Sequence, residues 1–502
     1  MNFIILESFF DKKHVYDENM YILVNTKWDD NFEFQVEYSL NIQKAHSKET
    51  NYIGTLKLGE KGQTNRNVNI EKNIVLNQLP ENLFSLGQSE EYYNNLKNVL
   101  SPSEIISFFR NMNDVAFDLN IFEEVKNENV TKKSLLRYVF ENTVKEQFHR
   151  IANGGDKFTG YELSFMPKGF NKDMNILEFH VDPNSKLSSN IHVLIGRNGV
   201  GKSFLMNSMV SNILYNLTDN GLFLNDVNIA SLVVSSFSAF DKYYPVSLTA
   251  PSVNNIAYKY IGLKKDFFNH TKNKLEKVNK DTDDLISEFA DLVFELINDS
   301  KKELWIECIK NLETDPIFKS VNIGRLVDFN GSKEDFIVEA STAFDRLSSG
   351  HKIIILTISS LVEMVSEKSL VILDEPEGHL HPPLLAAFMR TLSNLLKKKN
   401  GLAIISTHSP VVLQEVPSSC VWQIEREGGS QVFKRLNIKP FAENVGILTR
   451  EVFGLEVIES GYHSLLRKLS EENDNYESIM DTINNDIGDE GKGILMSLLI
   501  NK

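Results

Sequence analysis

The chain has 502 residues, 42% of them hydrophobic and 24% charged, an ordinary composition for a globular protein with more than one domain. Its formal net charge of −15 excludes the overall basic excess with which nucleic-acid-binding proteins neutralise phosphates. The two cysteines, Cys308 and Cys420, stand in no CxxC pair, which argues against a disulfide framework or a structural zinc site and predicts two buried thiols.

The N-terminal segment is apolar only as far as Glu7, where charges begin, so it lacks the plan of a signal peptide. No stretch approaches the roughly 18 uninterrupted apolar residues that a membrane-spanning helix needs. We therefore expect a cytoplasmic protein that does not contact a membrane.

Residues 1–150 change from strand-like to helix-like patterns. The first 75 residues alternate apolar and polar side chains in runs such as "MYILVNT" and "FEFQVEYSL", as strands do. Ser101, Pro102 and Glu104 then form a capping-box start, which predicts a helix from residue 102. Helical patterns continue to about residue 150, and Gly154 and Gly155 mark the boundary. We expect a β-rich and helical accessory domain over residues 1–150.

Residues 156–435 alternate strands with helices, which predicts an α/β fold with a mainly parallel, doubly wound sheet. The expected strands include "IHVLI", "ASLVVSSFSAFD", "SLVILD" and "LAIIST". Residues 262–318 are charged and helix-rich, so we expect them to form a helical lobe inserted into this core. Residues 436–502 are predicted to be a helical tail that docks a partner, with Gly454, Gly461 and Gly488 as helix breaks.

A group of lysines lies at the start of the expected helical lobe. We expect them on one helix, whose ordinary interpretation is a solvated face and whose alternative is a local basic patch. The group consists of Lys264, Lys265, Lys272, Lys274, Lys277 and Lys280.

The segment "IHVLIGRNGVGKSFLMNSMV" contains the pattern G-x-x-x-x-G-K-S between an apolar strand and a helix. In such a loop, glycines allow successive N–H groups and the helix N-terminus to point at a phosphate. Lys202 is predicted to reach the β- and γ-phosphate oxygens, and the Ser203 hydroxyl to bind Mg²⁺. The predicted ATP-binding residues of this loop are Gly196, Arg197, Asn198, Gly199, Val200, Gly201, Lys202 and Ser203.

An acidic pair follows a later apolar strand. In "SLVILDEPEGHLHP", the strand places Asp374 and Glu375 at its carboxyl end, where open α/β sheets bind ligands. Asp374 could hold Mg²⁺ and Glu375 could deprotonate a water; alternatively, the two carboxylates cap the next helix. His408, after the strand "LAIIST", is either a structural histidine or a donor to a γ-phosphate.

The segment "FDRLSSGHKI" is an ordinary helix start by its pattern, because serine and glycine precede an apolar helix. Ser348, Ser349 and Gly350 could therefore cap their own helix. Alternatively, they are held ready for a phosphate that another molecule carries, since a helix N-terminus attracts anions.

Together these segments resemble the motifs of the ABC-type ATPases. Residues 196–203 resemble Walker A, "SLVILDEP" resembles Walker B with the catalytic glutamate at Glu375, "STHS" resembles the motif of the switch histidine His408, and "LSSGHK" resembles the ABC signature. The resemblance covers residues 160–430. It implies that two copies of the chain enclose two Mg-ATP molecules, each bound by Walker A of one copy and by Ser348, Ser349 and Gly350 of the other.

The chain also departs from the transporter pattern. No glutamine stands where transporters have their Q-loop, so Ser236, Ser238 or Asp241 would have to serve the metal. No aromatic residue can be assigned to stack on adenine. His379 and His381 are expected to shape the turn after Walker B and a dimer contact, with a metal site as the alternative.

Within the family, "DEPEGHLHP" and the long insertion are more similar to the OLD, RecF and SMC proteins than to transporters. ATPases of this kind occur in bacterial anti-phage modules such as Gabija and Septu. The resemblance thus implies an ATPase that gates a separately encoded effector, such as a nuclease, in a defence complex. The alternatives are a DNA-repair ATPase that binds DNA and, third, the soluble ATPase of a transporter.

Overall fold

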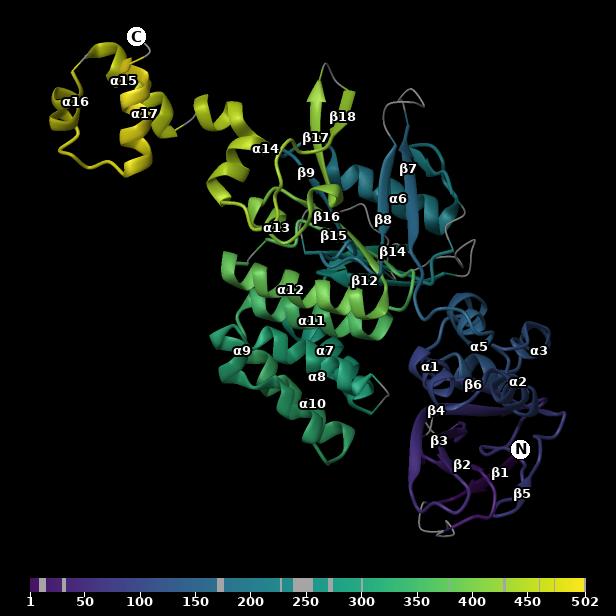
Figure 1. The fold of residues 1–502 in the computed structure, drawn as a ribbon. Helices are drawn as coiled ribbons and strands as arrows, with labels where there is room; N and C mark the ends of the chain where they lie inside the picture. Colours follow the sequence, from purple (N-terminus) through teal and green to yellow (C-terminus); the bar gives the residue numbers. More distant parts are fainter. Residues whose placement is uncertain are drawn as a thin grey trace.

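The computed structural model describes residues 1–500 except for 9–14, 29–32, 169–175, 226–227, 238–255, 270–273, 299–300, 379, 428–429, 460 and 474. The chain forms a six-stranded sheet with helices at its N-terminal end, a seven-stranded central sheet between a smaller sheet and a helical lobe, and a helical C-terminal region (Figure 1). The predicted α/β fold is therefore confirmed. Among the described residues, no helix is both long and apolar enough to span a membrane.

The N-terminal sheet has the strand order β5-β1-β2-β3-β4-β6, in which β1 and β2 are parallel and the other pairs antiparallel. Its alternating residues bury aromatic and aliphatic side chains against the following helices. The strands are β1 (Asn2–Leu6), β2 (Met20–Asn25), β3 (Glu37–Gln43), β4 (Thr50–Glu60), β5 (Val75–Leu76) and β6 (Leu83–Gly87). The helices are α1 (Glu90–Val99), α2 (Pro102–Asn111), α3 (Leu119–Val125), η2 (Thr131–Leu135), α4 (Glu141–Thr143), η3 (Val144–Phe148) and α5 (His149–Ala152).

Helix α2 begins as the sequence predicts. The Ser101 side chain accepts a hydrogen bond from the N–H of Glu104, whose carboxylate accepts one from the N–H of Ser101, and Pro102 occupies the first turn.

The central sheet has the strand order β12-β11-β15-β16-β9-β17-β18, and all its neighbours are parallel except the β17–β18 hairpin. Alternate residues of its inner strands face either α6 and a small sheet of order β10-β7-β8, or the helical lobe. The central strands are β9 (Ile191–Ile195), β11 (Ser231–Ser236), β12 (Ala257–Gly262), β15 (Leu370–Asp374), β16 (Leu402–Thr407), β17 (Val421–Glu427) and β18 (Ser430–Lys434). The small sheet and its helix comprise β7 (Tyr161–Pro167), β8 (Leu177–Val181), β10 (Gly221–Phe223) and α6 (Lys202–Tyr215).

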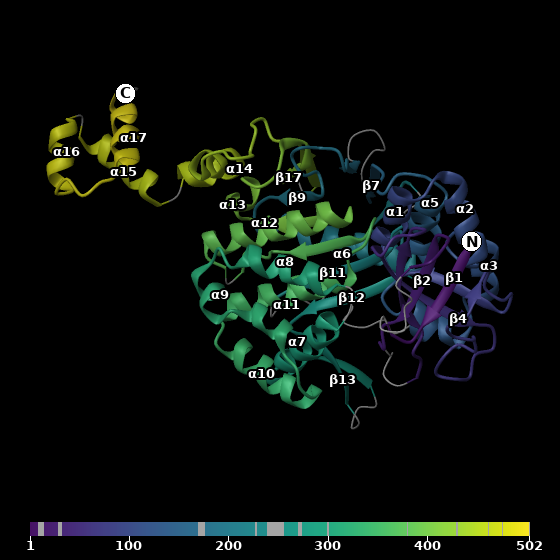
Figure 2. The same cartoon turned by 60° about the horizontal axis from the view of Figure 1, so that its bottom comes forward.

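The helical lobe covers the other face of the sheet (Figure 2). Its helices pack around the buried Trp305. Both expected thiols, Cys308 in the lobe and Cys420 outside it, are buried. The helices of the lobe extend further along the chain than predicted, to Asp345. The lobe and the helices next to the sheet are α7 (Thr282–Ile297), α8 (Lys302–Leu312), α9 (Pro316–Val321), η4 (Ile323–Asp328), α10 (Lys333–Asp345), α11 (Ser349–Met364), α12 (Pro382–Lys399), α13 (Pro410–Leu413) and η5 (Ser418–Cys420).

The expectation of a lysine-rich helix is wrong. Strands β13 (Lys264–Asn269) and β14 (Lys274–Asn279) pair as an antiparallel hairpin, in which Lys264 is the register partner of Asn279. Lys265 pairs with Asp284, and the Nζ atom of Lys280 lies 2.5 Å from Glu288. These carboxylates neutralise Lys265 and Lys280, which favours the solvated-face interpretation over a basic patch. Lys272 lies outside the described residues.

The N-terminal helices dock at the amino ends of the central strands. The Arg150 guanidinium lies 2.6 Å from the carboxylate of Glu367, three residues before β15, and Asn142 donates to the carbonyl of Ile229 before β11 (2.8 Å). Asn400, before β16, donates to the same Glu367 (3.0 Å). The accessory unit therefore contacts the amino ends of the central strands, whereas α/β sheets bind ligands at the carboxyl ends.

The C-terminal region consists of α14 (Val445–Glu459), α15 (Gly461–Glu472), α16 (Tyr476–Thr482) and α17 (Asp489–Ile500). In both views α15–α17 lie apart from the central sheet, at the end of the molecule opposite to the N-terminal unit (Figures 1 and 2). Gly461 and Gly488 adjoin helix ends as expected. Gly454 does not break a helix, because it lies inside α14, where a single glycine is tolerated.

Candidate functional site

The predicted phosphate loop connects β9 to α6 and has a glycine-dependent backbone. Gly199 and Gly201 have φ angles of +79° and +96°, which disfavour other residues. A Cβ atom at Gly196 would lie 2.3 Å from the carbonyl oxygen of Ile424 on β17. Gly199 and Gly201 are therefore required by the turn of the loop, and Gly196 by the close approach of β17.

Contacts within the chain also hold the side chain of Lys202 in the loop. Lys202 is buried, and its Nζ atom donates to the carbonyl oxygens of Gly196 (2.9 Å) and Arg197 (3.2 Å). Gln431, which the sequence analysis missed, donates from β18 to the carbonyl of Val200 (2.6 Å). Val200 is buried, Arg197 and Ser203 are half-buried, and Asn198 and Gly199 are exposed.

Polar oxygen atoms line the carboxyl ends of three neighbouring strands. Asp374 ends β15 in register with Ser236 of β11 and Ser406 of β16. Because alternate residues of a strand share a face, these three side chains lie on the α6 side of the sheet. The Ser406 hydroxyl donates to Asp374, whereas the buried Ser236 hydroxyl has no hydrogen-bond partner among the described residues.

This donor set fits magnesium, which prefers oxygen ligands and binds through one or two carboxylates. Asp374 supplies the carboxylate, and the Ser236 hydroxyl is a buried oxygen that a hydrated cation could satisfy. Of the three candidates for the missing glutamine, Ser236 is thus placed beside Asp374. Ser238 and Asp241 lie outside the described residues.

Glu375 occupies an uncommon backbone conformation at the same edge. Its φ angle is +48°, and its N–H donates to the carbonyl of Ser406 (3.0 Å). The side chain is 41% exposed, and its Oε1 atom lies 3.5 Å from Nζ of Lys202. The alternative that the acidic pair caps the next helix is wrong, since α12 begins at Pro382 with His381 as its N-cap.

His408 is held between two carboxylates. Its Nδ1 atom lies 3.7 Å from Oε1 of Glu375 and 3.2 Å from Oε1 of Glu377. The same Glu377 oxygen accepts hydrogen bonds from the N–H of His408 (2.7 Å) and from the Thr407 hydroxyl (2.6 Å). Glu377 was not predicted as a site residue, although it stands only two residues after Glu375 in "DEPEG". The structure therefore brings together Lys202, Asp374, Glu375 and His408.

The signature serine does not cap its helix with its side chain. Ser348 occupies the N-cap position of α11, yet its hydroxyl makes no capping hydrogen bond and lies 2.6 Å from Nδ1 of His351. Nε2 of His351 lies 2.9 Å from Oδ1 of Asp315. Ser349 is exposed and Gly350 buried. Among the interactions of the described residues, none of the three signature residues contacts the phosphate loop.

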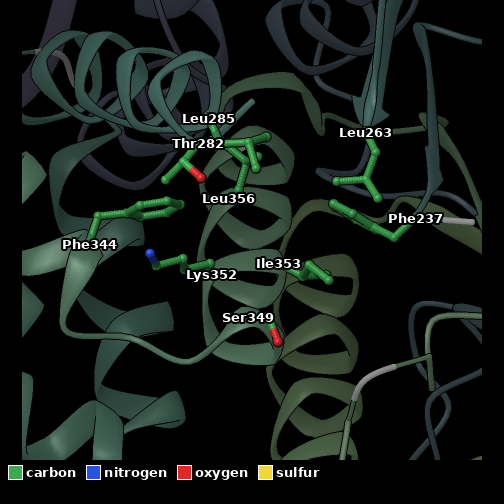
Figure 3. Close-up of a pocket in the computed structure, with 9 residues that line it drawn as sticks. All are labelled: Phe237, Leu263, Thr282, Leu285, Phe344, Ser349, Lys352, Ile353 and Leu356. Carbon is green, nitrogen blue, oxygen red and sulfur yellow. The ribbon is translucent and has the colours of Figure 1, made fainter. Parts of the chain in front are cut away.

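A cavity of about 340 Å³ lies beside the signature helix, between α11, α7 and the end of β11 (Figure 3). Thr282, Ser349 and Lys352 are its polar members, and the remaining lining residues are apolar. No residue of the phosphate loop lines this cavity, so it is separate from the predicted nucleotide site. The lining residues are Phe237, Leu263, Thr282, Leu285, Phe344, Ser349, Lys352, Ile353 and Leu356.

Of the two histidines after Walker B, the structure describes only His381. His379 lies outside the described residues, and His381 is 56% exposed at the N-cap of α12, with Nε2 4.0 Å from Asp315. In the described part of the chain, no three histidine, cysteine, aspartate or glutamate residues form a group that could hold a metal ion.

Three comparisons place the chain among known proteins. Residues 222–414, which include the signature, Walker B and His408 but not the phosphate loop, match the family model AAA_21, described as "AAA domain, putative AbiEii toxin, Type IV TA system". Over 519 aligned residues the chain is 38% identical to "Protein ea59" of Escherichia phage lambda, covering 97% of this chain and 96% of that protein.

The solved structures that match this chain include an ATP-binding cassette of an ABC transporter and an SMC head domain. The ADP conformation of an ATP-binding cassette of an ABC transporter has a TM-score of 0.29 and 14% identity, covering 60% of this chain and 98% of that chain. The SMC head domain from Thermotoga maritima has a TM-score of 0.27 and 12% identity, covering 56% of this chain and 100% of the head domain.

Proposed function

The chain belongs to the family of Protein ea59 of Escherichia phage lambda and contains an AAA-family ATPase domain, and from this premise we propose that it binds and hydrolyses Mg-ATP between two copies of itself. One observation carries the proposal: three distant segments of the chain bring together Lys202, the adjacent Asp374 and Glu375, and His408 at the carboxyl ends of the central strands. A lysine, two carboxylates and a histidine beside a phosphate-type loop are the groups that phosphoryl transfer to water requires.

The residues take separate roles in this mechanism. Lys202 exchanges its contacts with the loop carbonyls for the β- and γ-phosphate oxygens of ATP, which also draws its charge away from Glu375. Glu375 is then free to orient a water and accept its proton. His408, which Glu377 holds in place, donates to the γ-phosphate and stabilises the charge that develops there.

Asp374 would hold Mg²⁺ at the strand ends. The hydroxyl groups of Ser203 and Ser236 would contact the ion directly or through its water ligands. When bound, this ion neutralises charge on the β- and γ-phosphates. Ser406 donates to one oxygen of the Asp374 carboxylate and so fixes its orientation at the strand end.

The second copy supplies the signature residues Ser348, Ser349 and Gly350. Their separation from the phosphate loop of their own chain, described above, supports a role in trans. The N-terminus of α11 then presents free N–H groups to the γ-phosphate of the neighbouring copy. Hydrolysis removes the charge that joined the two copies, so ATP acts as a reversible link between them.

We further propose that this cycle gates a separately encoded effector, such as a nuclease, in a bacterial anti-phage defence complex. The accessory N-terminal unit (residues 1–150) and the C-terminal helices (residues 436–502) lie at opposite ends of the molecule and offer separate surfaces for partners. The toxin description of the matching family model supports a role of this kind.

A DNA-repair ATPase is the competing proposal and is equally compatible with the site. It requires a basic surface that would make DNA binding fall steeply with salt. The pairing of the hairpin lysines with Asp284 and Glu288 does not favour such a surface. Salt-sensitive binding of the ATP-bound dimer to DNA would support repair, whereas co-purification with an effector would support gating.

The central test is the substitution Lys202→Ala. We expect it to abolish tight Mg-ATP binding, measured by isothermal titration calorimetry, and ATP hydrolysis, because the β- and γ-phosphates lose their cation. The matched control is Lys186→Ala, an exposed lysine before β9 that lies outside the site. Wild-type ATP binding by the Lys202→Ala protein would refute the proposed site.

A further inference from the structure

The signature serine is the exposed end of a chain of three polar side chains. Behind Ser348 lies His351, which is 2% exposed in the first turn of α11, and behind His351 lies Asp315, which is 7% exposed at the N-cap of α9. The distances are 2.6 Å from the Ser348 hydroxyl to Nδ1 and 2.9 Å from Nε2 to Asp315. Phe318 packs its ring against the imidazole at 4.8 Å between centroids. The imidazole therefore has a fixed position and orientation.

The hydrogen-bond donors and acceptors in this chain can be assigned. Burial acts to raise the pKa of Asp315, but hydrogen bonds from His351 and from the N–H groups of Ile317 and Phe318 outweigh it and hold the pKa below its ordinary value. Asp315 is thus an ionised acceptor, and Nε2 of His351 must donate to it. In a neutral imidazole Nδ1 is then an acceptor, so the Ser348 hydroxyl proton points inward and its lone pairs point to solvent.

That arrangement does not suit a phosphate. The oxygens of the ATP γ-phosphate are acceptors, so they repel the outward lone pairs of Ser348 and need the hydroxyl proton instead. If Ser348 turns its proton outward, Nδ1 of His351 loses its donor at 2.6 Å. A proton on Nδ1 restores this hydrogen bond, because Nδ1–H then donates to the Ser348 hydroxyl oxygen. The Ser348 hydroxyl donates to the phosphate, and Nε2–H still donates to Asp315.

We propose that His351 and Asp315 are positioning residues that act through Ser348, and that His351 takes up one proton when Ser348 binds the γ-phosphate of ATP held by a second copy. No covalent bond changes: solvent supplies the proton, which lies between the negative charges of Asp315 and the phosphate. The inference rests on the proposed ATP-linked dimer. It adds that formation of the dimer consumes a proton at each signature face.

The groups around His351 decide which controls are needed. Asp315 is the charged partner from the α9 side, and His381, from the start of α12, lies 4.0 Å from the other Asp315 oxygen with its ring centroid 6.5 Å from that of His351. On α11 itself, Lys352 pairs with Asp345 at 3.2 Å. His381 is the neighbour that could take up the proton instead, and it is exposed, so its replacement is a suitable control.

The test measures the association constant of the full-length chain by analytical ultracentrifugation, with a non-hydrolysable ATP analogue and Mg²⁺, between pH 6 and pH 8.5. Uptake of one proton per face makes association weaker by up to about tenfold per pH unit and per face as the pH rises. We expect His351→Gln to lose this part of the slope and His381→Gln to keep it. Titration of the analogue is common to all the proteins and cancels in the comparison.

A second substitution guards against misfolding of the buried His351→Gln variant. Ser348→Ala changes an exposed side chain, and it should weaken association and remove the same part of the slope while analogue binding to Lys202 of the same copy is retained. Equal slopes in the wild type, His351→Gln and Ser348→Ala would overturn this inference alone. If the wild-type chain binds the analogue but never associates, the proposed dimer fails as well.

Discussion

The carboxylate of Glu377 is expected to set the position of His408, and two substitutions separate its charge from its shape. Glu377→Gln keeps a carbonyl oxygen that accepts from the N–H of His408 and from the Thr407 hydroxyl, now 2.7 and 2.6 Å away. It removes only the charge 3.2 Å from Nδ1 of His408. Glu377→Ala removes the charge and all three acceptor contacts.

The structure gives the magnitudes. Because the His408 side chain is 46% exposed, solvent screens its charge contact with Glu377 to about 1 kcal/mol, which corresponds to about a fivefold loss of kcat for Glu377→Gln. Glu377→Ala also loses two hydrogen bonds to a charged acceptor, each worth about 1.5 kcal/mol, so the total is about 4 kcal/mol and we expect about a thousandfold loss. Neither change touches Lys202, so KM for ATP should change little.

The assay is steady-state ATP hydrolysis over a range of ATP concentrations, with binding measured separately. Glu425→Gln, a half-exposed carboxylate on β17 that pairs with Lys434, is the matched control and should leave kcat unchanged. A Glu377→Ala protein with wild-type kcat would show that Glu377 does not hold His408. A loss of ATP affinity without a loss of kcat would assign Glu377 to binding.

Three further predictions concern hydrolysis and stability. Glu375→Gln should retain ATP and accumulate the ATP-bound dimer in size-exclusion chromatography, and normal turnover would remove Glu375 from its role. Glu367→Ala leaves Arg150 without its buried partner and should lower the free energy of unfolding by about 3–5 kcal/mol. The measurement is the midpoint of unfolding in urea, and an unchanged midpoint would show that the contact does not stabilise the fold. Burial outweighs the hydrogen bonds to Asp114 and raises its pKa from 3.8 to about 7, so the folded state binds more protons than the unfolded state between these values. Stability should therefore fall as the pH rises through this window, by on the order of 4 kcal/mol, and Asp114→Asn should flatten the profile; an equally steep profile in the variant would assign the dependence to other groups.

The parts of the fold that sequence predicted well are those with local signals. The phosphate loop needs glycines at fixed spacing, and the buried strand before Asp374 is a continuous apolar run, so both could be read from adjacent residues. The start of α2 was predictable for the same reason, because Ser101 and Glu104 are only three residues apart.

The hairpin β13–β14 was mistaken for a helix because its strands are short and charged and none of their described side chains is fully buried. A strand with no buried face has no strict alternation, and the lysine-rich composition is typical of helices as well. Backbone pairing of the two strands defines the structure there, and Lys265 and Lys280 contact Asp284 and Glu288 of the following helix α7.

The partners of the site residues could not be predicted, because they come from distant segments. Asp315 is separated from His351 by 36 residues, and Gln431 is separated from Val200 by 231. Glu377 was close in sequence to Glu375, but only the approach of β16 to β15 shows that it faces His408. Each of these residues acts through a contact that exists only once the sheet has formed.

The grip of the accessory unit on the strand beginnings has a mechanical consequence. A strand of five residues such as β15 is about 17 Å long. Arg150 contacts Glu367 just before the amino end of β15, and Asp374 lies at its carboxyl end. A ligand that moves residues 1–150 would shift the amino end of β15 without contacting the nucleotide. Because β15 is short, the same shift would move Asp374 at its carboxyl end. Binding of a ligand to residues 1–150 would then change the rate of ATP hydrolysis.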